Sequence, residues 1–485
     1  MATAKDREMF YQAMLSRDRR FDGRFFVGVT TTGVYCRPIC PAPKPKFENV
    51  KFYSSAAGAE AGGFRPCKRC RPDASPGTPV WSGTSATVSH ALQLIDNGFL
   101  DSQNVRELGK ILGVGDRQLR RLFNSHLGAP PIAVALTRRL DFARKLIDET
   151  RLSMTDVAFA SGFESIRRFN DAVKKRFGES PSDLRESART SKTGNGSKNR
   201  MILQLPFRPP LNWPALASYL KARQIPGVEV IEKDRYCRSI GSGKTRGIII
   251  VSPSPKEAHL ELSLQINNTA DLMNIVQRVR RMFDLGADPM FISHHLMKDP
   301  KLSPIVSSFP GLRIPGGWDN FEIAVRTVIG QQISIQAANT ITGRLVQRFG
   351  TPVRDSFVPG ITHLFPSPRI LASADMTGLG LPGKRSATLL NLASKVASGE
   401  IVLEGTVNTE AVKRSLMKVP GIGQWTTEYI AMRALREPDA FPAADLAIKR
   451  KLEDMSLQPD PWRPWRAYAA MYLWMAYAAG ISGKK

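Results

Sequence analysis

Residues 416–435 read LMKVPGIGQWTTEYIAMRAL, and this stretch decides the architecture of the C-terminal part of the chain. Apolar residues recur at three- and four-residue intervals on both sides of a Gly-Ile-Gly turn, so we predict two helices joined by a tight hairpin. Successive backbone N–H groups at Gly421 and Gly423, together with the N-terminus of the second helix, can bind a phosphate. The pattern therefore predicts a helix-hairpin-helix that contacts the DNA backbone.

A single acidic residue follows this hairpin, in the segment AFPAADLAIKR at 440–450. An isolated Asp before a helix ordinarily caps the helix N-terminus, and the residues alone favour that role for Asp445. Farther on, the nearly apolar run 467–481 falls short of the ~20 residues that span a bilayer and is typical of a buried helix. Trp474 lies in this run, so burial in the core and a place in a binding pocket are both open for it.

Residues 203 to about 481 resemble the 3-methyladenine DNA glycosylase II (AlkA) family of the helix-hairpin-helix superfamily. The resemblance implies hydrolysis of the N-glycosidic bond of alkylated bases such as 3-methyladenine, with Asp445 as the catalytic carboxylate. It also implies an aromatic pocket for a flipped, positively charged base, formed by Trp425, Tyr429 and Trp474. Trp425 stands where bifunctional relatives place a Schiff-base lysine, so we expect a monofunctional enzyme without lyase activity. The sequence has no C-terminal cysteine cluster, and we expect no iron–sulfur centre.

The segment VIGQQIS at 328–334 corresponds in this family to the loop that fills the gap left by a flipped base. Gln332 occupies the position where an apolar wedge is usual, and this departure puts the plugging mechanism in question. Ala444 precedes Asp445 where some relatives carry a second acid, so Asp445 is the less ambiguous candidate. We expect Gln332, like Gly421 and Gly423, to contact DNA.

Residues 201–310 are predicted to form an α+β domain, because RYCRSIGSGKTRGIIIVS and HLELSLQIN carry β-branched or alternating apolar residues around a Gly-Ser-Gly turn. The string GSGKT at 241–245 lacks the glycine that a phosphate-binding loop needs five positions before Gly243, where Arg238 stands. We therefore expect a hairpin turn. Cys237 is expected to be a buried strand residue.

Residues 84–186 consist of helical segments separated by Gly and capping residues. Two pairs, roughly 104–123 and 154–177, each place a small-residue turn before an Arg-rich helix, which is the pattern of a double helix-turn-helix. A helical bundle with a solvated basic face is the alternative from this pattern alone. GFESIRRFNDAVKKRFGESPSDLR resembles the end of AraC-type DNA-binding domains, so we expect an all-α AraC-type domain. The candidate DNA contacts are Gln118, Arg120, Arg121, Arg167 and Arg168.

Four of the five cysteines lie before residue 71, in two pairs: Cys36 with Cys40, and Cys67 with Cys70. Two such pairs can close one tetrahedral thiolate site, for which zinc fits best. A redox-active Cys-X-X-Cys is the weaker alternative, because the βαβ context of a thioredoxin-like motif is missing. A purely structural zinc ribbon is the stronger alternative, and the spacing alone favours it.

The surrounding residues TTTGVYCRPICPAP, ENVKFY and GFRPCKRCRPD closely resemble the methyl-acceptor zinc domain of the Ada family, over about residues 7–74. The resemblance implies one Zn²⁺ held by all four cysteines and stoichiometric methyl transfer from DNA methylphosphotriesters to Cys36. Methylation would remove one negative charge from the site, so repair would strengthen DNA binding and act as a switch. We therefore expect coupling to transcriptional regulation, with double-stranded promoter DNA and RNA polymerase as partners.

With 485 residues the chain exceeds the size of one hydrophobic core, and a net charge of +26 spread over its parts indicates several phosphate-binding modules. The N-terminus lacks the apolar core of a secretory signal, so we expect a cytoplasmic protein without a membrane role. We also expect it to be a monomer. The multidomain fold we expect comprises a small α+β zinc domain at 1–80, an all-α AraC-type double helix-turn-helix at 84–186, a linker at 187–200, an α+β AlkA N-terminal domain at 201–310, and an all-α helix-hairpin-helix glycosylase domain at 311–485.

Two functions of different classes remain open. The first is an alkylation-repair enzyme that excises bases and also transfers methyl groups. The second is a methylation-responsive transcription factor whose glycosylase region serves only to bind DNA. Release of free 3-methyladenine from methylated DNA discriminates between them.

Overall fold

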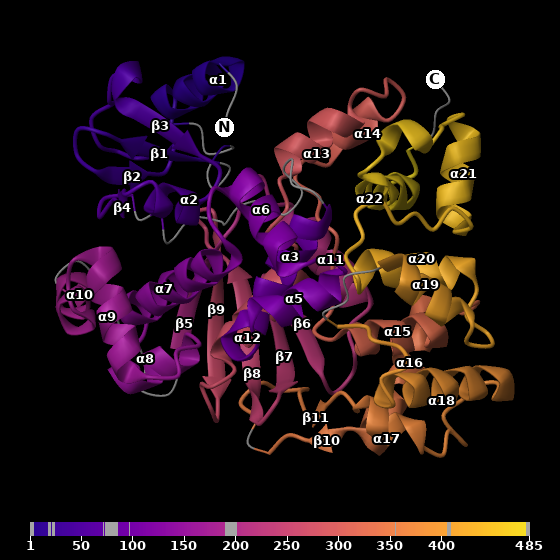
Figure 1. Cartoon of the computed structure of the whole chain (residues 1–485). Helices are drawn as coiled ribbons and strands as arrows, with labels where there is room; N and C mark the ends of the chain where they lie inside the picture. Colours follow the sequence, from indigo (N-terminus) through magenta and orange to yellow (C-terminus); the bar gives the residue numbers. More distant parts are fainter. Residues whose placement is uncertain are drawn as a thin grey trace.

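The computed structural model describes residues 4–17, 21, 25–70, 72, 86–96, 98–189, 201–354, 356–404 and 409–481. The chain runs through four consecutive parts, from the indigo N-terminus to the yellow C-terminus in Figure 1, and the predicted multidomain fold class is confirmed. We call these parts the cysteine module (4–72), the reader domain (86–189), the sheet domain (201–310) and the hairpin domain (311–481).

The cysteine module is a four-stranded sheet, in the order β3-β1-β2-β4, between two helices. Alternate residues of β1 point to opposite faces, so Phe26 packs with Ala59 of one helix while Val27 packs with Ala13 of the other. The elements are α1 (Ala4–Leu15), β1 (Phe26–Val29), β2 (Val34–Cys36), η2 (Phe47–Asn49), β3 (Val50–Tyr53), α2 (Ala56–Ala61) and β4 (Arg65–Pro66).

The reader domain contains the two predicted helix-turn-helix units, α5–α6 and α8–α9, joined by the long helix α7. Side chains of Asn104 and Ser153 cap the first helix of each unit. Its helices are α3 (Ala86–Asp96), α4 (Phe99–Ser102), α5 (Val105–Leu112), α6 (Asp116–Leu127), α7 (Pro131–Glu149), α8 (Met154–Ala160), α9 (Ile166–Phe177) and α10 (Pro181–Arg189). Helix α10 thus includes the first three residues of the predicted linker 187–200, and the rest of that linker lies outside the described residues.

The sheet domain is a five-stranded antiparallel sheet in the order β5-β9-β8-β7-β6. Ser242 pairs with Thr245 across the turn at Gly243, so the hairpin predicted for GSGKT is confirmed, and Cys237 is buried in a strand as expected. The elements are β5 (Met201–Pro206), α11 (Trp213–Ala222), β6 (Glu229–Glu232), β7 (Arg235–Ser242), β8 (Thr245–Pro253), β9 (His259–Ile266), α12 (Leu272–Met282), α13 (Pro289–Leu296) and α14 (Ser303–Ser308).

The reader domain packs directly on the edge of this sheet, where α7 lies beside β5 (Figure 1). On α7, Lys145 donates to the carbonyl of Gln204, and Glu149 accepts the Gln204 N–H at 2.9 Å. These side chains pair backbone groups that an edge strand otherwise leaves open. One buried apolar cluster also joins the two domains, with Leu146, Phe169, Leu184, Leu203, Leu205 and Leu262 among its members.

The hairpin domain is helical except for a short ribbon of two-residue strands, β10 and β11, which the all-α prediction did not include. It has two apolar cores, and α20 lies between them: Ile430 belongs to one core and Met432 to the other. The elements are α15 (Asn320–Ile329), α16 (Ile335–Phe349), β10 (Thr351–Pro352), β11 (His363–Leu364), α17 (Pro368–Ala372), α18 (Gly383–Ala397), α19 (Thr409–Met417), α20 (Gln424–Arg433), α21 (Leu446–Asp454), η4 (Asp460–Trp462) and α22 (Arg466–Ala478).

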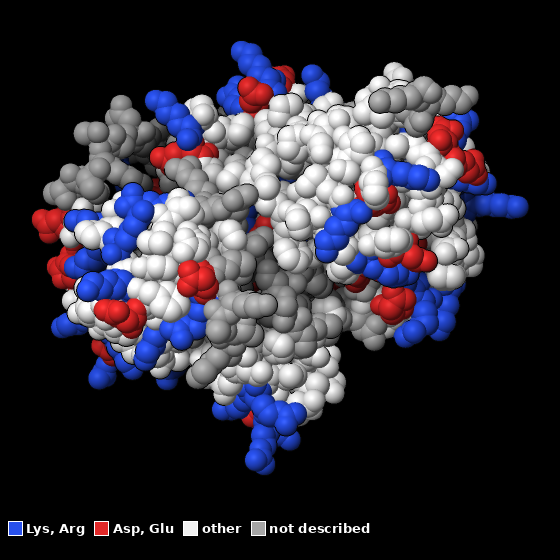
Figure 2. Space-filling model, turned by 90° about the horizontal axis from the view of Figure 1, so that it is seen from above, with Lys and Arg blue, Asp and Glu red and all other residues white. Residues whose placement is uncertain are grey.

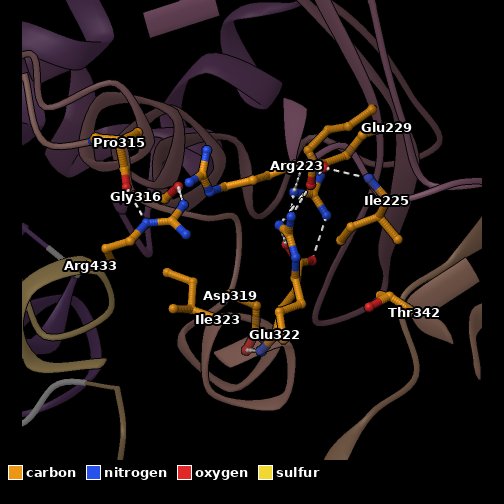
Figure 3. A network of polar contacts seen from close by, with 12 residues as sticks. Arg223, Ile225, Glu229, Pro315, Gly316, Asp319, Glu322, Ile323, Thr342 and Arg433 are labelled. Atoms are coloured by element: carbon orange, nitrogen blue, oxygen red, sulfur yellow. Dashed lines mark hydrogen bonds and ion pairs between the residues drawn. The ribbon is translucent and has the colours of Figure 1, made fainter. Parts of the chain in front are cut away.

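A buried polar network joins the sheet domain to α15 of the hairpin domain (Figure 3). The guanidinium of Arg238 lies between two carboxylates, 3.2 Å from Glu229 and 2.8 Å from Glu322. All three side chains are almost fully buried, so loss of one partner would leave an uncompensated charge. Arg238, which rules out a phosphate-binding loop in the sequence, thus fixes α15 against the sheet.

Candidate functional site

The four cysteines of the N-terminal pairs meet at one end of the cysteine module, where their Sγ atoms all lie within 4.8 Å of one another. Cys36 is the last residue of β2, and Cys70 follows β4. The backbone N–H of Arg37 donates to the Cys70 sulfur at 3.3 Å. Cys36 and Cys70 are buried, whereas Cys40 and Cys67 are partly exposed.

This donor set fits a zinc ion. Zn–S bonds of about 2.3 Å require four sulfurs this close together. Hydrogen bonds from the three neighbouring thiols, followed by burial, raise the pKa of Cys36 above its ordinary value. Four thiolates at this spacing need a cation to offset their charge, and soft sulfur ligands favour zinc. The residues present can therefore hold the cofactor that the sequence predicts.

The candidate DNA contacts of the reader domain lie on the two Arg-rich helices. Gln118, Arg120 and Arg121 of α6 are exposed, as are Arg167 and Arg168 near the start of α9. Arg120 pairs with Asp116 at 3.0 Å, one turn earlier on the same helix. On the face seen in Figure 2, Lys and Arg are not gathered in one patch: they stand along the left and right margins and also at the top and bottom of the view.

The Gly-Ile-Gly turn of 421–423 connects α19 to α20 and is exposed at both glycines. Gly421 has φ of +90°, and a Cβ there would lie 2.2 Å from the Thr388 hydroxyl, so this position requires glycine. Gly423 begins α20 without a side-chain cap. The first turn of α20 is therefore available to an anion such as a DNA phosphate.

The loop 330–334 lies beside this turn. The side-chain amide of Gln331 donates to the carbonyl of Gly421 at 2.9 Å and to the Thr426 hydroxyl at 2.8 Å. Gln332 is exposed and has φ of 54°, an uncommon conformation for a non-glycine residue. The structure thus presents Gln332 at the tip of a loop that Gln331 ties to the hairpin, a connection that sequence reasoning missed.

Asp445 lies at the N-terminus of α21, between two tryptophans. Its Oδ1 accepts the N–H groups of Ala447 and Ile448 at 3.1 and 3.3 Å, which makes it the helix cap. The indole N–H of Trp474 donates to Oδ1 at 2.9 Å, and that of Trp425 donates to Oδ2 at 3.2 Å. Asp445 therefore caps α21, the role that the residues alone favour, and it is at the same time hydrogen-bonded to two of the predicted pocket aromatics.

The three predicted pocket aromatics lie side by side next to this carboxylate. Trp425 and Tyr429 stack with ring centroids 5.3 Å apart and planes at 20°, and Trp474 is tilted against Tyr429 at 5.9 Å. All three are partly exposed, so Trp474 is not simply a core residue. The arrangement offers aromatic faces beside a single carboxylate, as a pocket for a cationic base requires.

Sequence reasoning missed a second layer behind these rings. The Tyr219 hydroxyl of α11 lies 2.7 Å from the Tyr429 hydroxyl, and Arg433 donates to the latter at 3.3 Å. Arg433 is in turn held by the carbonyls of Pro315 and Gly316 at 2.8 and 3.2 Å (Figure 3). No local pattern reveals Tyr219, because it comes from another domain, some two hundred residues earlier in the chain.

This second layer changes the acidity of the pocket. Burial raises the pKa of Tyr429, but the guanidinium groups of Arg433 and Arg223 and the hydrogen bond to Tyr219 outweigh burial and lower it to about 8. The Tyr219 pKa moves the other way, to about 12, chiefly because of burial. Tyr429 is thus the phenol that loses its proton first.

Among the described residues, no helix combines the length and the hydropathy of a bilayer-spanning segment.

Four family models match consecutive stretches of the chain. The metal binding domain of Ada matches residues 9–73, a helix-turn-helix domain 108–187, the AlkA N-terminal domain 202–319, and the HhH-GPD superfamily base excision DNA repair protein 325–461.

Known proteins resemble the whole chain or a part of it. "DNA-3-methyladenine glycosylase 2" of Escherichia coli is 31% identical over 56% of this chain and 95% of its own length. The "bifunctional transcriptional activator/DNA repair enzyme Ada" of the same species is 35% identical over 27% of this chain and 36% of its own length. A "probable bifunctional transcriptional activator/DNA repair enzyme AlkA" of Mycobacterium tuberculosis is 42% identical over 97% of this chain and 96% of its own length. The chain therefore belongs to the family of bifunctional transcriptional activator/DNA repair enzymes that join an Ada-type zinc module and helix-turn-helix domain to an AlkA-type glycosylase.

Proposed function

We propose that the hairpin domain hydrolyses the N-glycosidic bond of alkylated bases, and that Asp445 is its catalytic carboxylate. The observation that carries this proposal is the placement of Asp445 beside three aromatic rings, with each oxygen held by an indole N–H. A flipped alkylated purine carries positive charge and stacks favourably on Trp425 and Tyr429.

The reaction needs no strong general acid, because the alkylated base leaves with the electrons of the bond and becomes neutral. As the C1′–N bond breaks, positive charge develops on the sugar, and the Asp445 carboxylate stabilises it. Water then adds its oxygen to C1′ and gives a proton to the carboxylate or to solvent. No lysine stands at the position of Trp425, so a Schiff base to the sugar is not formed there and the product keeps an abasic site.

Substitution of Asp445 by Asn tests this role. Asn also caps helices well, so α21 keeps its N-terminus while the charge is removed. We expect base release from methylated DNA to fall roughly 10²- to 10³-fold in single-turnover assays. The matched control is Asp454→Asn, at the far end of the same helix, where the acid pairs with Lys451 at 3.6 Å. Base release near the unaltered rate in Asp445→Asn would exclude the catalytic role and favour a domain that only binds DNA.

We further propose that Cys36 accepts a methyl group from a methylphosphotriester. Its sulfur attacks the methyl carbon, the carbon–oxygen bond breaks, and the phosphate leaves as a diester anion. Zinc, when bound by the four cysteines, keeps the sulfurs deprotonated at neutral pH. The backbone N–H of Arg37 at the Cys70 sulfur stabilises charge on a neighbouring ligand. The thioether product is not regenerated, so each chain reacts once.

Peptide mapping after reaction with DNA that carries labelled methylphosphotriesters tests this assignment without altering the metal site. We expect one labelled methyl group per chain, in the peptide that contains Cys36. Cys237→Ala, which removes the cysteine outside the cluster, should label normally. Label on Cys40, Cys67 or Cys70 would show that the acceptor is a different ligand.

The reader domain is the part that we propose to bind promoter DNA, through exposed residues of α6 and α9 in successive major grooves. Transcriptional activation after methylation, contact with RNA polymerase and action as a monomer complete the proposal. The exposed Arg167 and Arg168 support DNA binding by α9.

A further inference from the structure

Arg176, in the last turn of α9, is the centre of a buried polar cluster between the reader domain and the cysteine module. Within the reader domain it donates to Asp141 at 2.7 Å and to the carbonyl of Thr137 at 3.0 Å. Across the interface it pairs with Glu60 at 2.7 Å and donates to the Tyr35 hydroxyl at 3.2 Å. The second helix-turn-helix is therefore bonded to the cysteine module through this guanidinium, and Lys68 of the module also pairs with Glu179, just after α9.

Tyr35 connects this cluster to the metal site. It directly precedes Cys36 in β2, and its carbonyl accepts the backbone N–H of Cys67 at 2.9 Å. Its hydroxyl donates to Glu60 at 2.7 Å, and its ring packs edge-on against Phe26. The fully buried Tyr35 side chain thus contacts Arg176, while its backbone belongs to the strand that ends at Cys36 and accepts the N–H of Cys67.

Methylation of Cys36 has a steric consequence in this setting. Cys36 is only 8% exposed, so a methyl group on its sulfur adds a carbon atom to a closely packed part of the module. A shift of the end of β2 would make room for it. Because Tyr35 belongs to that strand, such a shift would also disturb the hydrogen bonds of its hydroxyl with Glu60 and Arg176.

The other recognition helix is held by a separate part of the module. The hydroxyl groups of Ser54 and Ser55 donate to the carbonyls of His126 and Leu127, at 3.0 and 2.6 Å, at the C-terminal end of α6. These contacts come from the segment between β3 and α2, not from β2. A shift of β2 therefore reaches α9 through Arg176 while α6 keeps its own anchor.

We propose that Arg176 is a positioning residue that couples the methylation state of Cys36 to the placement of α9, the second recognition helix. This inference rests on the proposed methyl transfer and adds a mechanical route to the loss of negative charge at the zinc site. The route ends in the helix that carries the candidate DNA contacts Arg167 and Arg168. If Arg176 couples the two sites, its substitution changes the ratio between the DNA affinities of the methylated and the unmethylated protein. If its role is only structural, both affinities change by the same factor.

The test compares DNA affinity before and after methylation in the full-length, zinc-loaded chain. The probe is one duplex, selected from a random-sequence pool by the methylated, unaltered protein. We expect methylation to tighten binding by about 5- to 150-fold in the unaltered protein. Arg176→Met should lower this ratio severalfold, to the part that the loss of negative charge alone supplies, while the chain still takes up one methyl group and releases methylated bases normally. Arg176→Lys, which keeps the charge, should retain more of the ratio than Arg176→Met.

Tyr35→Phe is the gentler second variant, because it removes only the hydroxyl and leaves the ring packing in place. It should lower the ratio without unfolding the module, and zinc content of one ion per chain verifies this. The matched control is Arg139→Met on α7, which removes a guanidinium bonded to Asp101 at 2.8 Å within the reader domain. Arg139→Met should change both affinities together and keep the ratio.

Three results overturn the proposal. One is an undiminished ratio in both Arg176→Met and Tyr35→Phe. Another is an equal loss of the ratio in Arg139→Met. The third is a ratio of one in the unaltered protein with methyl transfer intact, which rejects the coupling but leaves the acceptor role standing. If the unaltered protein takes up no methyl group, in contrast, the proposed function of Cys36 is rejected, and this coupling is rejected with it.

Discussion

At the scale of single residues, Asp445 caps α21 and is also the carboxylate that we propose to be catalytic. A carboxylate has enough acceptor positions for two helix N–H groups and two indole N–H groups. The cap fixes the orientation of the carboxylate, and the indoles direct it toward the aromatic rings. In the proposed reaction, a carboxylate held in this way would need little reorganisation to reach the transition state.

Tyr429 gives a prediction at the same scale. Because its pKa is lowered to about 8 from an ordinary value of 10, the folded protein favours the phenolate more than the unfolded chain does. The stability gained from this is fully present above pH 10 and is lost as the pH falls through about 8. Ultraviolet titration should therefore show one tyrosinate forming with a midpoint near pH 8.

Two variants assign this transition. Tyr429→Phe should lack it, whereas Tyr477→Phe, at an exposed position on α22, should retain it. If no tyrosinate forms below pH 9 in the unaltered protein, the guanidinium groups of Arg433 and Arg223 do not govern the acidity of the pocket.

At the scale of elements, the hairpin between α19 and α20 depends on two glycines in different ways. Gly421 has a left-handed conformation and faces Thr388, whereas Gly423 has φ of −96° and open space where a Cβ would lie. We expect Gly421→Ala to cost about 2 kcal/mol of the free energy of unfolding, and Gly423→Ala less than about 0.5 kcal/mol.

Urea unfolding followed by tryptophan fluorescence measures both variants. Weakened binding to undamaged DNA should accompany the loss of stability in Gly421→Ala, because the first turn of α20 loses its geometry. Equal unfolding midpoints for the two variants would contradict the assigned difference in backbone strain.

The elements that could be predicted from the sequence are those whose defining residues lie close together in the chain. The Gly-Ile-Gly hairpin, the two cysteine pairs and the helix-turn-helix pairs each lie within a short window, and the structure has them where the patterns indicate. The contacts between Tyr219 and Tyr429 and between Tyr35 and Arg176 join residues far apart in the chain. Such contacts depend on how whole domains pack, and no periodicity in one sequence encodes them.

At the scale of the whole molecule, the reader and sheet domains form one packed unit despite the polar segment between them in sequence. Leu146 and Phe169 share a buried cluster with Leu203 and Leu262, and α7 pairs with the edge strand β5. Cleavage at a protease site introduced between residues 190 and 200 should therefore leave the two fragments associated.

Size-exclusion chromatography after cleavage measures this directly, and both fragments should elute together at the volume of the intact chain. Lys145→Glu, which places a negative charge against the Gln204 carbonyl, should weaken the association. Separate elution of the fragments of the unaltered protein would show that the shared cluster does not hold the halves together.

The same packing has a consequence for how long the proposed methylation of Cys36 persists. In the methyl transfer that we propose, the methyl group stays on Cys36, and the interfaces at Arg176 and β5 keep the cysteine module, the reader domain and the sheet domain together. Each molecule would thus react once with a methylphosphotriester and could still remove many bases. The response would therefore end as newly made chains dilute the methylated ones, and not as soon as the lesions are removed.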